Sequence, residues 1–75
     1  MTKEQLYRTL EKYVEEDLKQ ISENDDLTDV GIDSISIMSI IEELRMQHIS
    51  VTFMDFAEET TIAAWLRKIQ QKTAR

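Results

Sequence analysis

The chain has 75 residues, no cysteine, no proline and a single glycine, and it carries a net charge of −6. A chain of this length forms at most one domain and buries only about 60% of the surface that it exposes when unfolded, so an enclosed active site has little room. The lack of cysteine excludes disulfides and thiolate chemistry, and the acidic balance argues against nucleic acid as a partner, because phosphate binding needs a basic face.

The composition also bears on the compartment and the fold class. The first residues, MTKEQLY, lack the apolar core of a signal peptide, and no apolar stretch approaches the roughly 20 residues that span a bilayer. We therefore expect a soluble, cytoplasmic, monomeric protein with no membrane partner. The abundance of Leu, Ile, Glu, Lys and Gln predicts helices joined by short connections.

The first predicted element is a helix from about residue 3 to about residue 20. Thr2 and Gln5 have the spacing of a capping box. Apolar residues then recur at steps of four, four, four and three, which is the pattern of one helical stripe. The stripe consists of Leu6, Leu10, Val14, Leu18 and Ile21.

The segment SENDDLTDVGID, residues 22–33, is predicted to be a polar loop that Leu27 and Val30 attach to the core. Its acidic residues suggest a calcium loop. No window, however, combines alternating acidic ligands with a glycine at the sixth place and a glutamate at the twelfth, as an EF-hand requires. We therefore expect a solvated loop.

A second helix is predicted to begin at Asp33 or Ser34, with Asp33 as its N-cap. It carries two stripes, one containing Ile37, Ile40, Ile41, Leu44 and His48, the other Ile35, Met38, Glu42 and Arg45. Two apolar faces in the first turns have two interpretations. Either one face is exposed and binds a partner, or this helix is the most buried one in the domain.

The remainder is predicted to be an extended segment, one short helical turn and a last helix. Ile49, Val51 and Phe53 alternate as in a strand, but no other segment could pair with them, so we expect an extended loop. Residues 54–58 could form one turn, and Thr60 or Thr61 caps the last helix. The apolar face of that helix consists of Ile62, Trp65, Leu66 and Ile69, and its basic residues are Arg67, Lys68, Lys72 and Arg75.

These elements predict an all-α fold, a small four-helix bundle with three main helices and one short helix.

The sequence contains few groups that could catalyse a reaction. Ser34 and His48 would lie roughly 21 Å apart on one helix, beyond the reach of a nucleophile and its base. One histidine without cysteine makes a zinc site unexpected, and His48 is interpreted as a packed or capping residue. We therefore do not expect an enzyme.

Ser34 is the side chain best placed to be modified. Gly31 permits a sharp turn and Asp33 starts the helix, so Ser34 falls in an exposed first turn where the helix dipole favours an attached phosphate. Aspartate followed by serine is common at helix starts, and these two residues alone favour an ordinary capping role.

The larger segment DVGIDSISIMSIIEELR, residues 29–45, resembles the phosphopantetheine attachment site of carrier proteins. The family motif is Gly-x-Asp-Ser followed by an aliphatic residue, and Gly31, Asp33, Ser34 and Ile35 match it. The resemblance extends over nearly the whole chain. It implies that Ser34 accepts 4′-phosphopantetheine from coenzyme A through a separate, magnesium-dependent phosphopantetheinyl transferase. It also implies that the thiol of this arm carries a thioester, so that a chain without cysteine performs thiol chemistry.

One departure and two similarities suggest the subfamily. The second helix has no acid before Glu42, unlike the acidic second helix of carriers of fatty acid synthesis. The segment FAEETTIAAWLRKI is similar to the end of carriers of nonribosomal peptide synthesis, and Trp65 resembles a feature of aryl carrier proteins of siderophore synthesis. That resemblance implies an aryl cargo such as 2,3-dihydroxybenzoate or salicylate. An adenylating aryl acid ligase would load it, and a condensation domain of a nonribosomal peptide synthetase would receive it.

The resemblance further implies a partner surface of Ile35, Met38, Phe53, Met54 and Ala57, although one of Phe53 and Met54 is expected to pack in the core instead. Residues 1–75 would form a single carrier domain, either free-standing or excised. Two alternatives stay open. One is an acyl or aminoacyl carrier of another pathway, and the other is a helical adaptor that is never modified and binds a partner helix through Ile35 and Met38. A small enzyme ranks last.

Overall fold

The computed structural model describes residues 2–73, which form four α-helices and two 3₁₀ turns and contain no strand. The α-helices are α1 (Lys3–Leu10), α2 (Ser34–Met46), α3 (Phe53–Ala57) and α4 (Ile62–Thr73), and the 3₁₀ turns are Leu18–Gln20 and Leu27–Val30. The predicted all-α bundle with one short helix is thus confirmed. No helix within the described range is long and apolar enough to cross a membrane.

The first helix is shorter than predicted. The capping box of Thr2 and Gln5 is present, but α1 ends at Leu10, so the predicted helix over residues 3–20 is wrong beyond that point. The amide of Glu15 donates to Val30 of the later loop, and Asp17 caps the separate 3₁₀ turn Leu18–Gln20. Three consecutive acids at 15–17 would also lie near a helix C-terminus, where the dipole disfavours negative charge. The stripe still points inward, because Val14 and Leu18 are buried.

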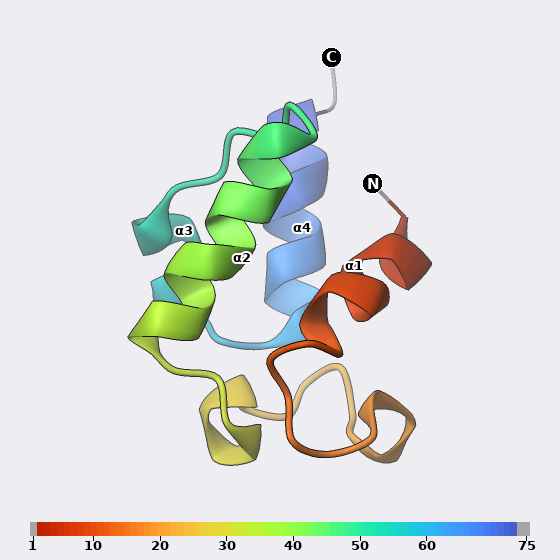
Figure 1. The fold of residues 1–75 in the computed structure, drawn as a ribbon. Helices are drawn as coiled ribbons and strands as arrows, with labels where there is room; N and C mark the ends of the chain where they lie inside the picture. Colours follow the sequence, from red (N-terminus) through yellow and green to blue (C-terminus); the bar gives the residue numbers. More distant parts are fainter. Residues whose placement is uncertain (1, 74–75) are drawn as a thin grey trace.

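The long loop between α1 and α2 crosses the end of the bundle at which α2 and α4 both begin (Figure 1). Leu27 and Val30 are buried, as predicted, and so is Ile32. Backbone hydrogen bonds join this loop to the start of α4. The amide of Leu27 donates to Thr60 over 2.7 Å, and the amide of Ala63 donates to Glu23 over 3.0 Å. The loop is therefore an ordered part of the fold that sets the position of the next helix.

Helix α2 has one buried and one exposed apolar face. The buried face is made of Ile37, Ile40, Ile41 and Leu44. Ile35 and Met38 lie on the other face and are 75% and 59% exposed. The predicted exposure of one apolar face is therefore confirmed at the start of α2, while its binding of a partner stays a prediction.

The end of α2 is a Schellman motif. The amide of His48 donates to Arg45 and the amide of Ile49 donates to Leu44, each over 2.9 Å. His48 has a φ of 65°, in the left-handed region that normally selects glycine. Its side chain is exposed, so His48 occupies a capping position and does not pack in the core.

After α2, residues 49–52 form a loop, as predicted, and Ile49 and Val51 are buried, but Phe53, which was expected to belong to this loop, is the first residue of α3. Thr52 and Asp55 form a capping box, and α3 begins one residue earlier than expected. The Thr61 hydroxyl accepts from the amide of Ala64 at the start of α4. On α4, Ile62, Trp65 and Ile69 are buried and Leu66 is partly buried. The predicted basic residue Arg75 lies outside the described range.

Candidate functional site

Ser34 is the first residue of α2 and is exposed. Within residues 2–73, no hydrogen-bond partner occupies its hydroxyl. The nearby hydroxyl of Ser36, in contrast, donates to the Asp33 carboxylate over 3.0 Å. Of these two serines in the first turn, Ser34 therefore has the hydroxyl that is free to react.

Asp33 holds the start of α2 in place. One of its carboxylate oxygens accepts from the Ser36 amide at 2.8 Å, which is the geometry of an N-cap. This bond, followed by the one from the Ser36 hydroxyl, lowers the pKa of Asp33 below its usual range. The cap is thus an anion at neutral pH, and the predicted capping role of Asp33 is confirmed.

Gly31 makes the turn that leads into α2. It ends the 3₁₀ turn Leu27–Val30 with φ at 108° and ψ at −2°, a conformation that other residues rarely adopt. A Cβ atom at this position would lie 3.3 Å from the Cγ atom of Glu15. The positive φ selects glycine here, two residues before the cap, whereas the exposed Glu15 side chain could move away from a Cβ atom. A phosphate ester on Ser34 would then lie at the positive end of the α2 dipole.

The residues predicted to bind partners lie on the surface near Ser34. Met54 is 62% exposed, Ala57 is exposed, and Phe53 is 39% exposed. The expectation that Phe53 or Met54 packs in the core is wrong, because Phe56 takes that position and is fully buried. Together with Ile35 and Met38 on α2, these side chains form what we term the apolar patch: Ile35, Met38, Phe53, Met54 and Ala57.

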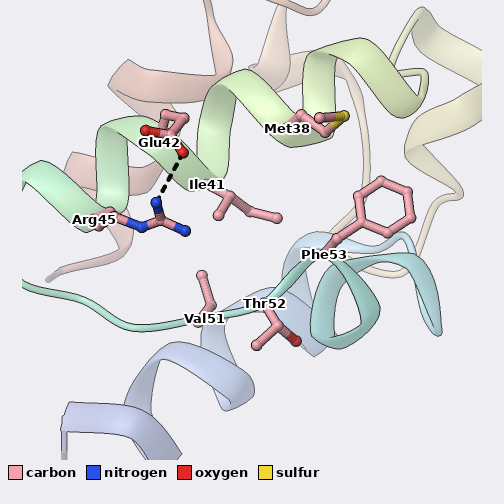
Figure 2. Close-up of a pocket in the computed structure, with 7 residues that line it drawn as sticks. All are labelled: Met38, Ile41, Glu42, Arg45, Val51, Thr52 and Phe53. Atoms are coloured by element: carbon pink, nitrogen blue, oxygen red, sulfur yellow. Dashed lines mark ion pairs between the residues drawn. The ribbon is translucent and has the colours of Figure 1, made fainter.

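Two grooves flank Phe53, which lines both. The Ser34 groove has a volume of about 390 Å³ and is lined by Thr28, Ile32, Asp33, Ser34, Ile37, Phe53, Ala57 and Thr60. The Arg45 groove, of about 270 Å³, is lined by Met38, Ile41, Glu42, Arg45, Val51, Thr52 and Phe53. Figure 2 shows Met38 and Phe53 at one end of the Arg45 groove and the ion pair of Glu42 and Arg45 at the other, with 3.2 Å between the charged atoms.

Thr28 and Thr60 line the Ser34 groove but were not predicted as site residues. A local signal could have drawn attention to Thr28, because Asp26 and Thr28 have the spacing of an Asx turn. Thr60 comes to the Ser34 groove from a segment distant in the sequence, and no local pattern reports such a contact.

His48 lies at the opposite end of α2 from Ser34, so the structure does not bring the two together. In the part of the chain that the structure describes, no three His, Cys, Asp or Glu side chains are grouped so that they could hold a metal ion. The chemistry offered by the site is therefore that of an exposed hydroxyl at a helix N-terminus, beside an apolar patch.

Comparison with known proteins identifies similar sequences. The model of one family, described as "Phosphopantetheine attachment site", matches residues 4–69. The isochorismatase of Bacillus subtilis (strain 168) is 31% identical over 72 residues, which are 96% of this chain and 23% of that protein. A phenyloxazoline synthase of Mycobacterium sp. (strain MCS) is 43% identical over 49 residues, which are 65% of this chain and 4% of that protein.

A pseudomonine synthase of Pseudomonas entomophila (strain L48) is 33% identical over 61 residues, which are 79% of this chain and 10% of that protein. The chain thus spans less than a quarter of the length of each of these three relatives. No solved structure matches the chain significantly.

Proposed function

We propose that this chain, which belongs to the family of phosphopantetheine attachment domains, is an aryl carrier in which Ser34 bears the covalent 4′-phosphopantetheine. The observation that carries the proposal is the exposed, unbonded hydroxyl of Ser34 in the first turn of α2, inside the matched region. The arm would come from coenzyme A through a separate magnesium-dependent phosphopantetheinyl transferase. Residues 1–75 would then form one carrier domain.

The residues around Ser34 fit this group. The ester phosphate is anionic, and the helix N-terminus at Ser34 favours negative charge. Gly31 and Asp33 keep that N-terminus in place, and the hydroxyl is open to a large transferase. When bound, the arm supplies a thiol that can hold an acyl group as a thioester. The chain contributes the attachment point, its orientation and the docking surface.

The proposed cargo is an aryl acid, 2,3-dihydroxybenzoate or salicylate. The surface of α2 beside Ser34 supports this subfamily, because its first two turns are apolar or hydroxylic and its first acid is Glu42. One relative supports it as well, since a phenyloxazoline synthase is named for a product that contains an aryl ring.

The proposed partners are an adenylating aryl acid ligase, which loads the arm, and a condensation domain, which unloads it. Both would dock on the apolar patch. A carrier must leave each partner between steps, and a small patch of exposed apolar side chains beside the attachment point suits brief binding. In this account the chain is a carrier and performs no catalysis itself.

Parallel loading assays test which acid the arm carries. The modified protein is incubated with an aryl-adenylating ligase, ATP and salicylate or 2,3-dihydroxybenzoate. In parallel, it is incubated with acyl- and aminoacyl-adenylating ligases and their acids, and intact mass reports each thioester. We expect salicyl or 2,3-dihydroxybenzoyl thioester on the modified wild type and on Ser36→Ala, and none on Ser34→Ala. Loading by the acyl or aminoacyl ligases alone would contradict the aryl assignment while leaving the carrier function intact.

A further inference from the structure

The carboxylate of Asp26 joins the long loop to the segment just before α4. One of its oxygens accepts three hydrogen bonds, from the Thr28 amide at 3.0 Å, the Thr28 hydroxyl at 2.8 Å and the Thr60 hydroxyl at 2.6 Å. Thr28 belongs to the 3₁₀ turn of the loop, whereas Thr60 lies 34 residues after Asp26 in the sequence. We term these three residues, Asp26, Thr28 and Thr60, the loop latch.

The negative charge of Asp26 strengthens the loop latch. Hydrogen bonds to an ionised carboxylate are stronger than those between neutral groups. The bond from Thr60, followed by those from Thr28, lowers the pKa of Asp26 below its usual range, so the carboxylate is ionised at neutral pH. The backbone closes the same joint, because the amide of Leu27 donates to the carbonyl of Thr60. The Thr60 hydroxyl is therefore the one side-chain donor of the loop latch that comes from outside the long loop.

A short hydrogen-bonded path leads from the loop latch to Ser34. Asp26 is the N-cap of the 3₁₀ turn that begins at Leu27. The amides of Gly31 and Ile32, which follow this turn, both donate to the Leu27 carbonyl. These bonds set the direction in which the chain leaves the turn, and Ser34 begins α2 two residues later. The position of Ser34 therefore depends on where Asp26 holds the turn.

We propose that Asp26 and Thr60 are positioning residues for the modification of Ser34, because their bond holds the loop in the form that the transferase binds. The inference rests on the proposed attachment to Ser34. Neither residue touches the transferred group in this account. A protein whose binding-competent form is only partly populated binds with a proportionally weaker apparent affinity. Breaking the loop latch should therefore raise the KM of the transferase for this carrier and leave kcat nearly unchanged.

Amide hydrogen exchange tests whether the loop latch holds the joint closed. Thr60→Val keeps the side-chain shape and removes the donor, whereas Thr60→Ser keeps the hydroxyl. The amides of Leu27 and Ala63 donate across the joint, so we expect them to exchange about fivefold faster in Thr60→Val than in the wild type and in Thr60→Ser. The amide of Ile49, at the other end of α2, should exchange at the same rate in all three proteins.

The kinetics of arm attachment test whether the closed joint positions Ser34. The carrier concentration is varied at saturating coenzyme A, and intact mass reports the rate. Asp26→Ala removes all three bonds, and we expect it to raise KM at least about threefold with kcat changed less than about twofold. Thr60→Val should act in the same direction, and it decides the question if Asp26→Ala does not fold. Thr60→Ser should match the wild type.

Glu43→Gln is the matched control, because Glu43 also accepts a hydrogen bond from a distant residue, the Tyr13 hydroxyl, but away from the long loop. It should leave KM unchanged. An unchanged KM in the folded latch variants, an equal rise in Glu43→Gln, or unchanged exchange at Leu27 and Ala63 in Thr60→Val would overturn the inference and leave the carrier function standing. Failure of the arm to attach to the folded wild type would overturn both.

Discussion

The indole Nε1 of Trp65 donates a hydrogen bond of 2.9 Å to the backbone carbonyl of Phe56, and the two rings stack with 4.2 Å between their centroids and 8° between their planes. Both side chains are fully buried. Asp55, beside Phe56 in the chain, lies 3.5 Å from the ammonium of Lys72 and 4.0 Å from that of Lys68. Helix α4 therefore holds the short helix that carries three residues of the apolar patch.

The two phenylalanines of α3 should differ in their effect on stability. Phe56→Leu removes the stack on Trp65 and leaves space in the core, so we expect the free energy of unfolding to fall by about 2 kcal/mol. Phe53→Leu changes a side chain that is 39% exposed and should cost less than about 1 kcal/mol. Urea unfolding measures both variants, and equal losses would contradict the packing described here.

Much of this arrangement follows from local sequence signals. The Asp33 cap and the burial of Leu27 and Val30 could be predicted, because capping and periodicity act over a few neighbouring residues. For the same reason, the position of Ser34 at the head of α2 could be expected from the residues around it. The same periodicity showed two apolar stripes on the second helix, but it left open whether Ile35 and Met38 are exposed.

The remaining features depend on contacts between distant segments. Helix α1 ends at Leu10, and beyond it the Glu15 amide bonds to Val30, fifteen residues away in the sequence. Phe56 packs in the core against Trp65, and Thr60, a lining residue of the Ser34 groove, bonds to Asp26 from a distant part of the sequence. Tertiary contacts of this kind override local preference, and one sequence alone does not report them.

The C-terminus of α2 offers a test of backbone strain. His48 has a φ of 65°, so His48→Gly should stabilise the protein by about 0.5–1 kcal/mol, because the left-handed conformation costs glycine little. The neighbouring Gln47 has a φ of −98°, and Gln47→Gly should instead destabilise by about 0.5–1 kcal/mol. Thermal unfolding compares the two variants, and a loss of stability in His48→Gly would contradict the assignment.

The apolar patch can be tested with two exposed methionines of the same helix. Met38 belongs to the patch, whereas Met46, which is 80% exposed, lines neither groove. Met38→Lys places a charge in the proposed interface and should lower kcat/KM for loading by the aryl ligase at least about tenfold, mainly through KM. Met46→Lys should leave it unchanged, and both variants should unfold as the wild type does. Equal effects of the two substitutions would rule out this docking surface.

Acid should weaken the contact that Lys12 and Tyr13, in the segment after α1, make with Glu43 on α2. The Lys12 ammonium, and then the Tyr13 hydroxyl, hold the pKa of Glu43 below its usual range. The folded state therefore favours the carboxylate. This contribution to stability is present above about pH 5 and is lost as the pH falls through the unfolded value of about 4.3 towards the lower folded value.

Glu43→Gln should accordingly be about 1 kcal/mol less stable than the wild type at pH 7, and this difference should shrink towards pH 3. Urea midpoints over that pH range measure it, with the exposed Glu16→Gln as the matched control. A deficit that stays constant from pH 7 to pH 3 would show that Glu43 does not act through its charge.

The central claim is that Ser34 carries the arm, and intact mass tests it most directly. The wild type, Ser34→Ala and Ser36→Ala are each incubated with coenzyme A, magnesium and a promiscuous phosphopantetheinyl transferase. We expect the wild type and Ser36→Ala to gain the mass of one phosphopantetheine and a correctly folded Ser34→Ala to gain none. No gain on folded wild type, or an equal gain on Ser34→Ala, would contradict the claim, and the former would favour an unmodified helical adaptor.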